Sequence, residues 1–136
     1  MPFSYYDAPM SNHDRNASGL EPVASRPHMP GYGLAEGTEG LLHWSWAESR
    51  LARSHDYWLA TTRPDGRPHL MPVWGIWLER VFYFSTGRHS RKARNLESNA
   101  YCVVANDEAR EAVVVEGVAH ELMDVPLRKQ LLSLIE

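Results

Sequence analysis

Between residues 57 and 122 the chain alternates short runs of strand-favouring residues with turn residues, and this pattern most limits its possible folds. The expected strands cover residues 57–62, 68–78, 81–85, 101–105 and 112–122, the last of them interrupted at Gly117. Arg63-Pro64-Asp65-Gly66 predicts a tight turn, because proline presets one backbone dihedral and glycine accepts a positive φ. So few helices fit between these strands that a doubly wound parallel sheet is excluded. The sequence therefore predicts a mainly β fold, a small antiparallel barrel with a few short helices.

Two helices are expected at either end of the first three strands. Ser45 with Glu48 forms a capping-box pattern and predicts a helix over residues 45–54. Ser90 is expected to cap a second helix that ends at residue 98.

The first forty residues differ in composition from the rest of the chain. They hold five of the nine prolines and five of the nine glycines, which predicts an irregular N-terminal arm over residues 1–40. Residues 41–136 are then one folded domain, since 136 residues are too few for two ordinary domains. Asp124 and Pro126 open its last helix, whose apolar face carries Leu127, Leu131, Leu132 and Ile135. This helix meets the end of the sequence without a terminating glycine, as expected of a truncated C-terminal segment.

Composition and charge exclude several classes of protein. The formal net charge of −3 argues against a general nucleic-acid-binding surface. No apolar run approaches the roughly 18 to 20 residues of a membrane span, and the N-terminus does not resemble a secretory signal. We therefore expect no membrane partner and a cytoplasmic location. The single cysteine, Cys102, and seven histidines without metal-binding spacing predict neither a disulfide nor a metal site.

The strongest functional signal is a local excess of positive charge. Four of the fourteen lysines and arginines fall within residues 88–94, after a strand that ends in two hydroxyl residues. The expected helix places Arg91 and Lys92 in its first turn, where the helix dipole disfavours cations. Phosphate or a similar anion would be stabilised there by backbone N–H groups, hydroxyls and cations together. The alternative is a solvated basic face without a ligand.

This stretch also resembles the phosphate-binding segment of the pyridoxamine 5′-phosphate oxidase-like superfamily, the FMN-binding split barrels. The segments that carry the resemblance follow one another along roughly residues 45–123: Asp65-Gly66-Arg67-Pro68-His69, Met71-Pro72-Val73-Trp74, Phe84-Ser85-Thr86, Ser90-Arg91-Lys92-Ala93, Asn95-Leu96, Asn99 and residues 113–119. Met71-Pro72-Val73-Trp74 and the helix start at Arg91-Lys92 are similar to branches of flavin- or deazaflavin-dependent oxidoreductases.

The resemblance implies a Greek-key split barrel that forms a homodimer, with the cofactor at the subunit interface. It implies that Ser85, Thr86, Ser90, Arg91 and Lys92 hold the cofactor phosphate, and that Met71, Pro72, Val73 and Trp74 line its ring system. The cofactor is FMN or the deazaflavin coenzyme F-420. Met71 replaces an arginine of the pyridoxamine phosphate oxidases proper, which argues against that reaction and favours deazaflavin. No catalytic side chain is expected, because hydride transfer is the chemistry of the cofactor.

The sequence thus predicts an oxidoreductase that transfers a hydride between the cofactor ring and a small organic substrate. The alternative function is binding or carriage of flavin, deazaflavin or haem without turnover. Binding of RNA through residues 88–94 is a third hypothesis, against which the net negative charge argues. Trp74 and Trp77 are expected on opposite faces of one strand, and a further hypothesis gives His69 and His89 a hydrogen bond to the cofactor or substrate.

Overall fold

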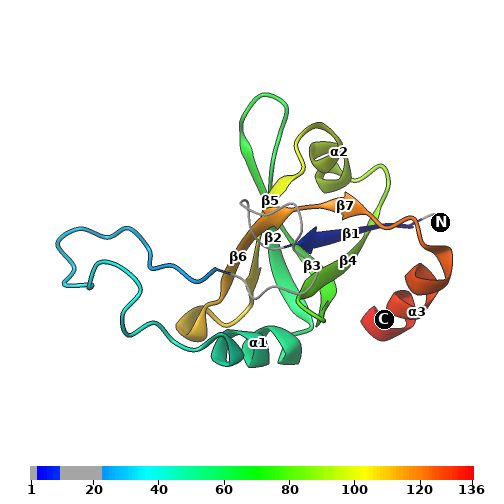
Figure 1. The fold of residues 1–136 in the computed structure, drawn as a ribbon. Helices are drawn as coiled ribbons and strands as arrows, with labels where there is room; N and C mark the ends of the chain where they lie inside the picture. The colour runs from blue at the N-terminus through cyan, green and yellow to red at the C-terminus, as the bar shows by residue number, and fades with distance from the viewer. Residues whose placement is uncertain (1–2, 10–22) are drawn as a thin grey trace.

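The computed structural model describes residues 3–9 and 23–136, and these form one curled antiparallel sheet with three short α-helices around it (Figure 1). The elements follow in the order β1 (Phe3–Pro9), α1 (Trp44–Arg53), β2 (Asp56–Thr62), β3 (Pro68–Leu78), β4 (Val81–Gly87), α2 (Arg91–Ser98), β5 (Tyr101–Asn106), a 3-10 turn (Ala109–Glu111), β6 (Val114–Val118), β7 (His120–Glu121) and α3 (Val125–Ile135). The strands lie side by side as β6-β5-β2-β3-β4-β1-β7. The predicted mainly β fold is confirmed, and the sheet curls as a split barrel does.

Local sequence signals set the ends of several elements as expected. β3 has the predicted bounds, and Gly66 in the preceding turn has a φ of +85°, with its N–H donating to the Arg63 carbonyl at 2.8 Å. Ser90 caps α2, because its Oγ accepts a hydrogen bond from the Ala93 N–H at 3.2 Å. Asp124 caps α3 in the same way.

The cap of α1 differs from the sequence prediction. The helix begins at Trp44, and the cap is His43, whose Nδ1 accepts from the Ser45 N–H at 3.2 Å. The Ser45 hydroxyl is bonded to the same imidazole nitrogen at 2.8 Å, so it is not free to act as the cap. The predicted capping box is therefore wrong, although the helix itself is present.

The N-terminal arm is not irregular throughout. Phe3–Pro9 form β1, which pairs with β4 along its whole length and with β7 at Tyr6 and Asp7. Composition averaged over forty residues hides this short run of strand-favouring residues. Pairing with β1 also explains why β4 runs two residues beyond the predicted end at Ser85, since Ser4 pairs with Thr86 and Phe3 with Gly87.

The strand predicted over residues 112–122 is broken, but not at Gly117. Gly117 lies within the ladder opposite Cys102, and the break falls at Ala119, whose N–H donates to the Ala100 carbonyl at 2.8 Å. At this residue the chain leaves β5 and continues beside β1 as β7. The change of partner strand, rather than glycine flexibility, interrupts the strand.

The core lies where the sheet curls over α1. Tyr57 and Phe82 are fully buried with ring centroids 4.5 Å apart, and the Tyr57 hydroxyl donates to the Ser54 carbonyl at 2.8 Å. Burial raises the pKa of Tyr57 to about 12. Gly75 lies against the Phe82 ring, and a Cβ at that position would be 2.4 Å from the Phe82 Cζ. Only glycine therefore lets β3 approach β4 this closely.

Candidate cofactor site

The site is built where β3 and β4 separate. The two strands pair only between Gly75–Leu78 and Val81–Phe84. Before Gly75, β3 remains paired with β2, and after Phe84, β4 remains paired with β1. A gap in the hydrogen-bond ladder is thus left between residues 72–74 of β3 and residues 85–87 of β4.

Proline at position 72 provides a physical reason for this separation. The Gly75 N–H donates to the His55 carbonyl at 3.2 Å, on the β2 side of the strand. Alternation along an antiparallel strand directs the backbone of residue 73 to the same side and that of residue 72 toward β4. Because Pro72 has no N–H, it cannot donate a ladder hydrogen bond to β4.

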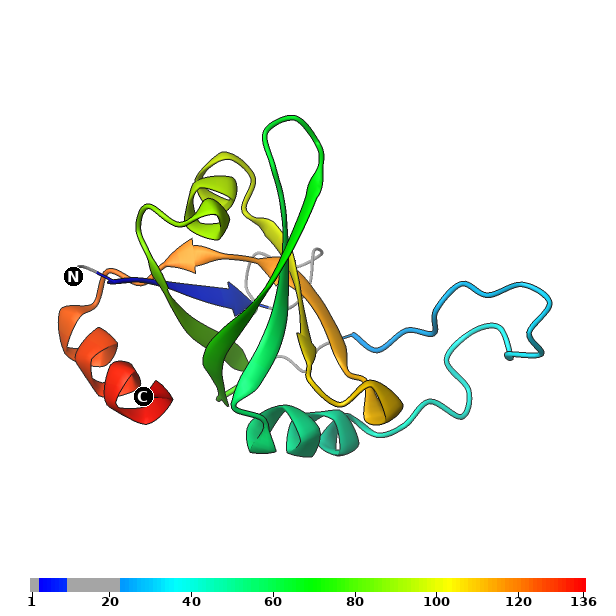
Figure 2. The same ribbon diagram turned by 180° about the vertical axis from the view of Figure 1, so that it is seen from behind.

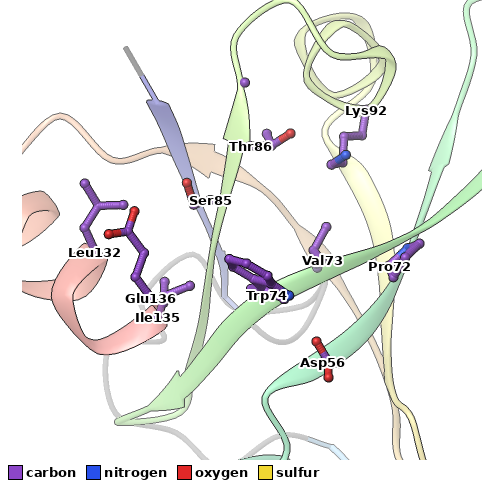
Figure 3. Close-up of a pocket in the computed structure, with 11 residues that line it drawn as sticks. Asp56, Pro72, Val73, Trp74, Ser85, Thr86, Lys92, Leu132, Ile135 and Glu136 are labelled. Carbon is purple, nitrogen blue, oxygen red and sulfur yellow. The ribbon is translucent and has the colours of Figure 1, made fainter. Parts of the chain in front are cut away.

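A cavity of about 550 Å³ lies in this gap (Figure 3). The residues that line it come from five elements: Asp56 of β2, Pro72, Val73 and Trp74 of β3, Ser85, Thr86 and Gly87 of β4, Lys92 of α2, and Leu132, Ile135 and Glu136 at the end of α3. Six of the nine residues predicted to hold a cofactor are among them: Pro72, Val73, Trp74, Ser85, Thr86 and Lys92. Their assignment to a cofactor stays a prediction, but the fold does bring these six together.

The other three predicted residues lie outside the cavity wall. The Ser90 Oγ is 2.9 Å from the Thr86 Oγ1, so it supports a wall residue while capping α2. Arg91 is exposed in the first turn of α2, next to Lys92. Met71 is 43% exposed and pairs with Leu59 of β2, at the open end of the gap.

The two tryptophans of β3 face opposite sides, as predicted. Trp74 is 57% exposed and lines the cavity. Trp77 is 5% exposed and packs edge-to-face against Trp44 of α1, with centroids 5.7 Å apart. Only Trp74 can contact a ligand in the cavity.

The C-terminal helix forms the wall opposite Trp74. The His55 Nε2 lies 3.0 Å from the Ile135 carbonyl oxygen, and the His55 ring lies 5.5 Å from that of Trp74. Leu131 and Ile135 are buried, which fixes the face that α3 turns to the sheet. The α3 wall of the cavity therefore carries the apolar Leu132 and Ile135 and the acidic Glu136, and the β4 wall carries hydroxyl groups.

The basic residues of 88–94 do not act as one group. Arg88 forms an ion pair with Glu121 of β7 at 2.8 Å. Arg91 and Lys92 form no ion pair with any residue of the range 23–136. Burial lowers the pKa of Lys92, as expected of an ammonium that lacks a counter-ion.

Two further basic residues, His69 and Arg63, lie near Arg91 and Lys92 at the start of α2. Burial lowers the pKa of His69 below its usual value, and the charges of Arg63, Lys92 and Arg91 lower it further. The Nδ1 of His69 and the Nε of Arg63 are buried and have no hydrogen-bond partner within the described chain. The sequence predicts His69 beside the site but places Arg63 only in the turn before β3. His89 is exposed and does not line the cavity.

This arrangement fits the phosphate end of a cofactor. Two hydroxyl residues and Lys92 line the β4–α2 side of the cavity, near Arg63 and Arg91. The two acidic residues of the lining, Asp56 and Glu136, come instead from β2 and the end of α3. An anion supplies the acceptors that guanidinium, ammonium and imidazolium groups require. Residues 23–136 contain no cluster of histidine, cysteine and acidic side chains suited to a metal ion. No helix of the described chain is long and apolar enough to cross a bilayer.

Comparison with known proteins places the chain in a family. The family model for pyridoxamine 5′-phosphate oxidase matches residues 47–136. A solved structure described as an F420 reductase superposes with a TM-score of 0.55 at 28% identity, over 64% of this chain and 71% of that chain. A conserved hypothetical protein of Mycobacterium tuberculosis, Rv2991, gives a TM-score of 0.61 at 23% identity, over 67% of this chain and 60% of that one, and this likeness concerns the fold alone. None of the curated proteins compared with the chain matches it. Because the family model covers the sheet from β2 onward, α2 and α3, the chain belongs to the pyridoxamine 5′-phosphate oxidase family.

Proposed function

We propose that the protein is an oxidoreductase that uses FMN or the deazaflavin coenzyme F-420 and exchanges a hydride between the cofactor ring and a small organic substrate. The observation that carries the proposal is the group of unneutralised cations at the end of a cavity in the β3–β4 gap. Family membership and the likeness to an F420 reductase support the same class of cofactor.

The residues at the start of α2 would hold the cofactor phosphate. Arg91 and Lys92 supply charge, and Ser85, Thr86 and Ser90 supply hydroxyl groups. Charge-assisted hydrogen bonds contribute about 1.5 to 3 kcal/mol each, so this end would provide much of the binding energy. The partly buried Lys92 ammonium would gain the counter-ion it lacks in the described chain.

Residues 71–74 would line the ring system of the cofactor. Pro72 and Trp74 place apolar surface on the cavity wall, and Ile135 and Leu132 face it from α3. When bound, the cofactor supplies the hydride chemistry. The residues of this chain orient the ring and exclude water from it. No acid–base pair is assigned, and the substrate would enter beside Trp74.

We further propose that the protein is a homodimer with the cavity at the subunit interface. Five large apolar side chains on the outer face of β2, β3, β5 and β6 are 44–62% exposed: Trp58, Leu70, Trp74, Tyr101 and Val114. The strand register places them on one face, because Trp58 pairs with Pro72 and Ala105, and Ala105 pairs with Val114. A contiguous apolar face of this kind favours burial by a second copy. Sedimentation equilibrium should give a dimer, and a monomer at all accessible concentrations would contradict the proposal.

Absorption spectroscopy tests the proposed function directly. Purified protein is titrated with FMN, with F-420 and with haem, and each spectrum is compared with that of the free ligand. Saturable binding of FMN or F-420 supports the proposal, and a Soret band with haem alone would replace it with the haem-carrier alternative. Turnover of reduced cofactor with quinones, enones or tetrapyrroles then separates an enzyme from a carrier.

A further inference from the structure

We propose that Arg63 and His69 complete the anion site begun by Arg91 and Lys92, and that His69 takes up a proton when a phosphate-type anion binds there. The inference rests on the proposed function, because it takes the cofactor phosphate to be the anion. It adds two residues to the site and makes the strength of binding depend on pH.

The fold fixes the two new residues beside α2. His69 pairs with Thr61 near the end of the β2–β3 hairpin, and Arg63 follows two residues after Thr61. The fully buried Asn95 of α2 donates from its Nδ2 to the Thr61 Oγ1 at 3.0 Å. The hairpin tip and α2 also lie at the same end of the sheet in both views (Figures 1 and 2). Arg63 and His69 are therefore held next to the start of α2 by the packing of the hairpin against this helix.

Two polar atoms at the junction of the β2–β3 hairpin and α2 lack hydrogen-bond partners. The His69 Nδ1 and the Arg63 Nε are buried without a hydrogen-bond partner in the described residues. Buried polar atoms in folded proteins almost always have partners. The charged groups around His69 are guanidinium and ammonium groups, which only donate. An anion would supply the oxygen acceptors that both the Arg63 Nε–H and a protonated His69 need.

The charges around His69 all have the same sign. Arg63 faces it from the end of β2, and Arg91 and Lys92 face it from α2. Among residues 23–136, no carboxylate is one of the charged groups that shift its pKa. Together with burial, these cations hold the pKa of His69 below its usual value, so the imidazole is neutral in the free protein at neutral pH.

A bound anion would shift His69 from the neutral toward the protonated form. Negative charge among Arg63, Arg91 and Lys92 cancels their field at the imidazole and favours the protonated form. By linkage, a ligand that raises the pKa of a group binds more tightly in the pH range where that group becomes protonated. Affinity for an anion of constant charge should therefore increase as the pH falls from the pKa of His69 in the complex to its lower pKa in the free protein, and should be constant above and below this window.

The test follows the His69 ring by proton NMR across pH 5 to 8.5. The His69 signal is assigned by its loss in His69→Gln, and His43, on the far helix α1, is the internal control. Sulfate is the first probe because its charge is constant over this range, and FMN and F-420 are the second. On saturation, the His69 midpoint should rise by about one pH unit or more, whereas the His43 signal should not respond to the ligand. One unit corresponds to about a tenfold gain in affinity between high and low pH.

Variants give the second readout. His69→Gln should remove the pH dependence of the sulfate dissociation constant. Arg63→Gln should weaken binding about tenfold at every pH. A His69 midpoint that does not move on saturation overturns the inference.

The outcomes separate this inference from the proposed function. If FMN or F-420 binds while the His69 midpoint stays unchanged, only this inference fails. If sulfate moves His69 and neither cofactor binds, the proposed function fails and the anion site stands. If neither sulfate nor a cofactor binds, both fail.

Discussion

The helices α1 and α2 pack against the same core and carry basic residues in opposite settings. At the end of α1, Arg50 and Arg53 each bond one oxygen of Glu111 at 2.7 Å, and Arg50 also lies 3.8 Å over the Trp46 ring. At the start of α2, Arg91 and Lys92 face no acid in the described chain and lie against the helix dipole. The first pair fastens a helix to the β5–β6 connection. The second pair costs stability, which is typical of residues retained to bind a ligand.

Removing each pair should therefore have opposite consequences. In Arg91→Ala with Lys92→Ala, the dissociation constant for FMN or F-420 should rise by about a hundredfold or more, since at least ~3 kcal/mol of charge-assisted bonding is lost. The urea unfolding midpoint should rise slightly, because the cations that oppose the helix dipole are removed. In the matched control, Arg50→Ala with Arg53→Ala, the midpoint should fall and the affinity should stay. Equal cofactor affinity in the first variant and in the natural protein would remove Arg91 and Lys92 from the site.

The ion pairs of Glu111 predict a smaller effect, which is a change in stability at acidic pH. Hydrogen bonds from Arg50 and Arg53 hold the pKa of Glu111 below its usual value. The folded state therefore releases this proton more readily than the unfolded state, so the stabilisation is present above the unfolded pKa and is lost as the pH falls through the folded one. In Glu111→Gln, the urea midpoint should be lower than that of the natural protein at pH 7, and the difference should shrink as the pH falls below the usual pKa of a glutamate. A difference that stays constant as the pH falls would show that the charge of Glu111 is not what fastens α1.

Much of the fold was predictable because its signals are local. The Pro-Asp-Gly turn, the Ser90 and Asp124 caps and the bounds of β3 each depend on a few neighbouring residues. The strand β1 and the break at Ala119 were missed because both depend on a partner strand far away in the sequence.

In the candidate site, too, the residues predicted correctly depend on local sequence and those missed depend on tertiary packing. Six predicted residues line the cavity because their segments end next to the point where β3 and β4 separate. Arg63 was missed because its nearness to α2 depends on the packing of Asn95 against Thr61, which no local pattern encodes. His69 could be named only as a flanking residue, since its burial and its three cationic neighbours arise from tertiary packing.

The smallest expected effect separates the destabilisation of the fold by Lys92 from its proposed contribution to cofactor binding. Its ammonium is partly buried and has no counter-ion in the described chain, so Lys92→Met should raise the free energy of unfolding by about 0.5 kcal/mol. The matched control is Lys129→Met on the exposed side of α3, which should leave stability unchanged. With saturating FMN or F-420 the order should reverse, because tighter binding stabilises the natural protein more than the variant. Urea midpoints with and without cofactor measure both effects. If Lys92→Met lowers stability in the absence of cofactor, then Lys92 belongs with Arg50 and Arg53 as a structural cation, and the contrast between the two helices disappears.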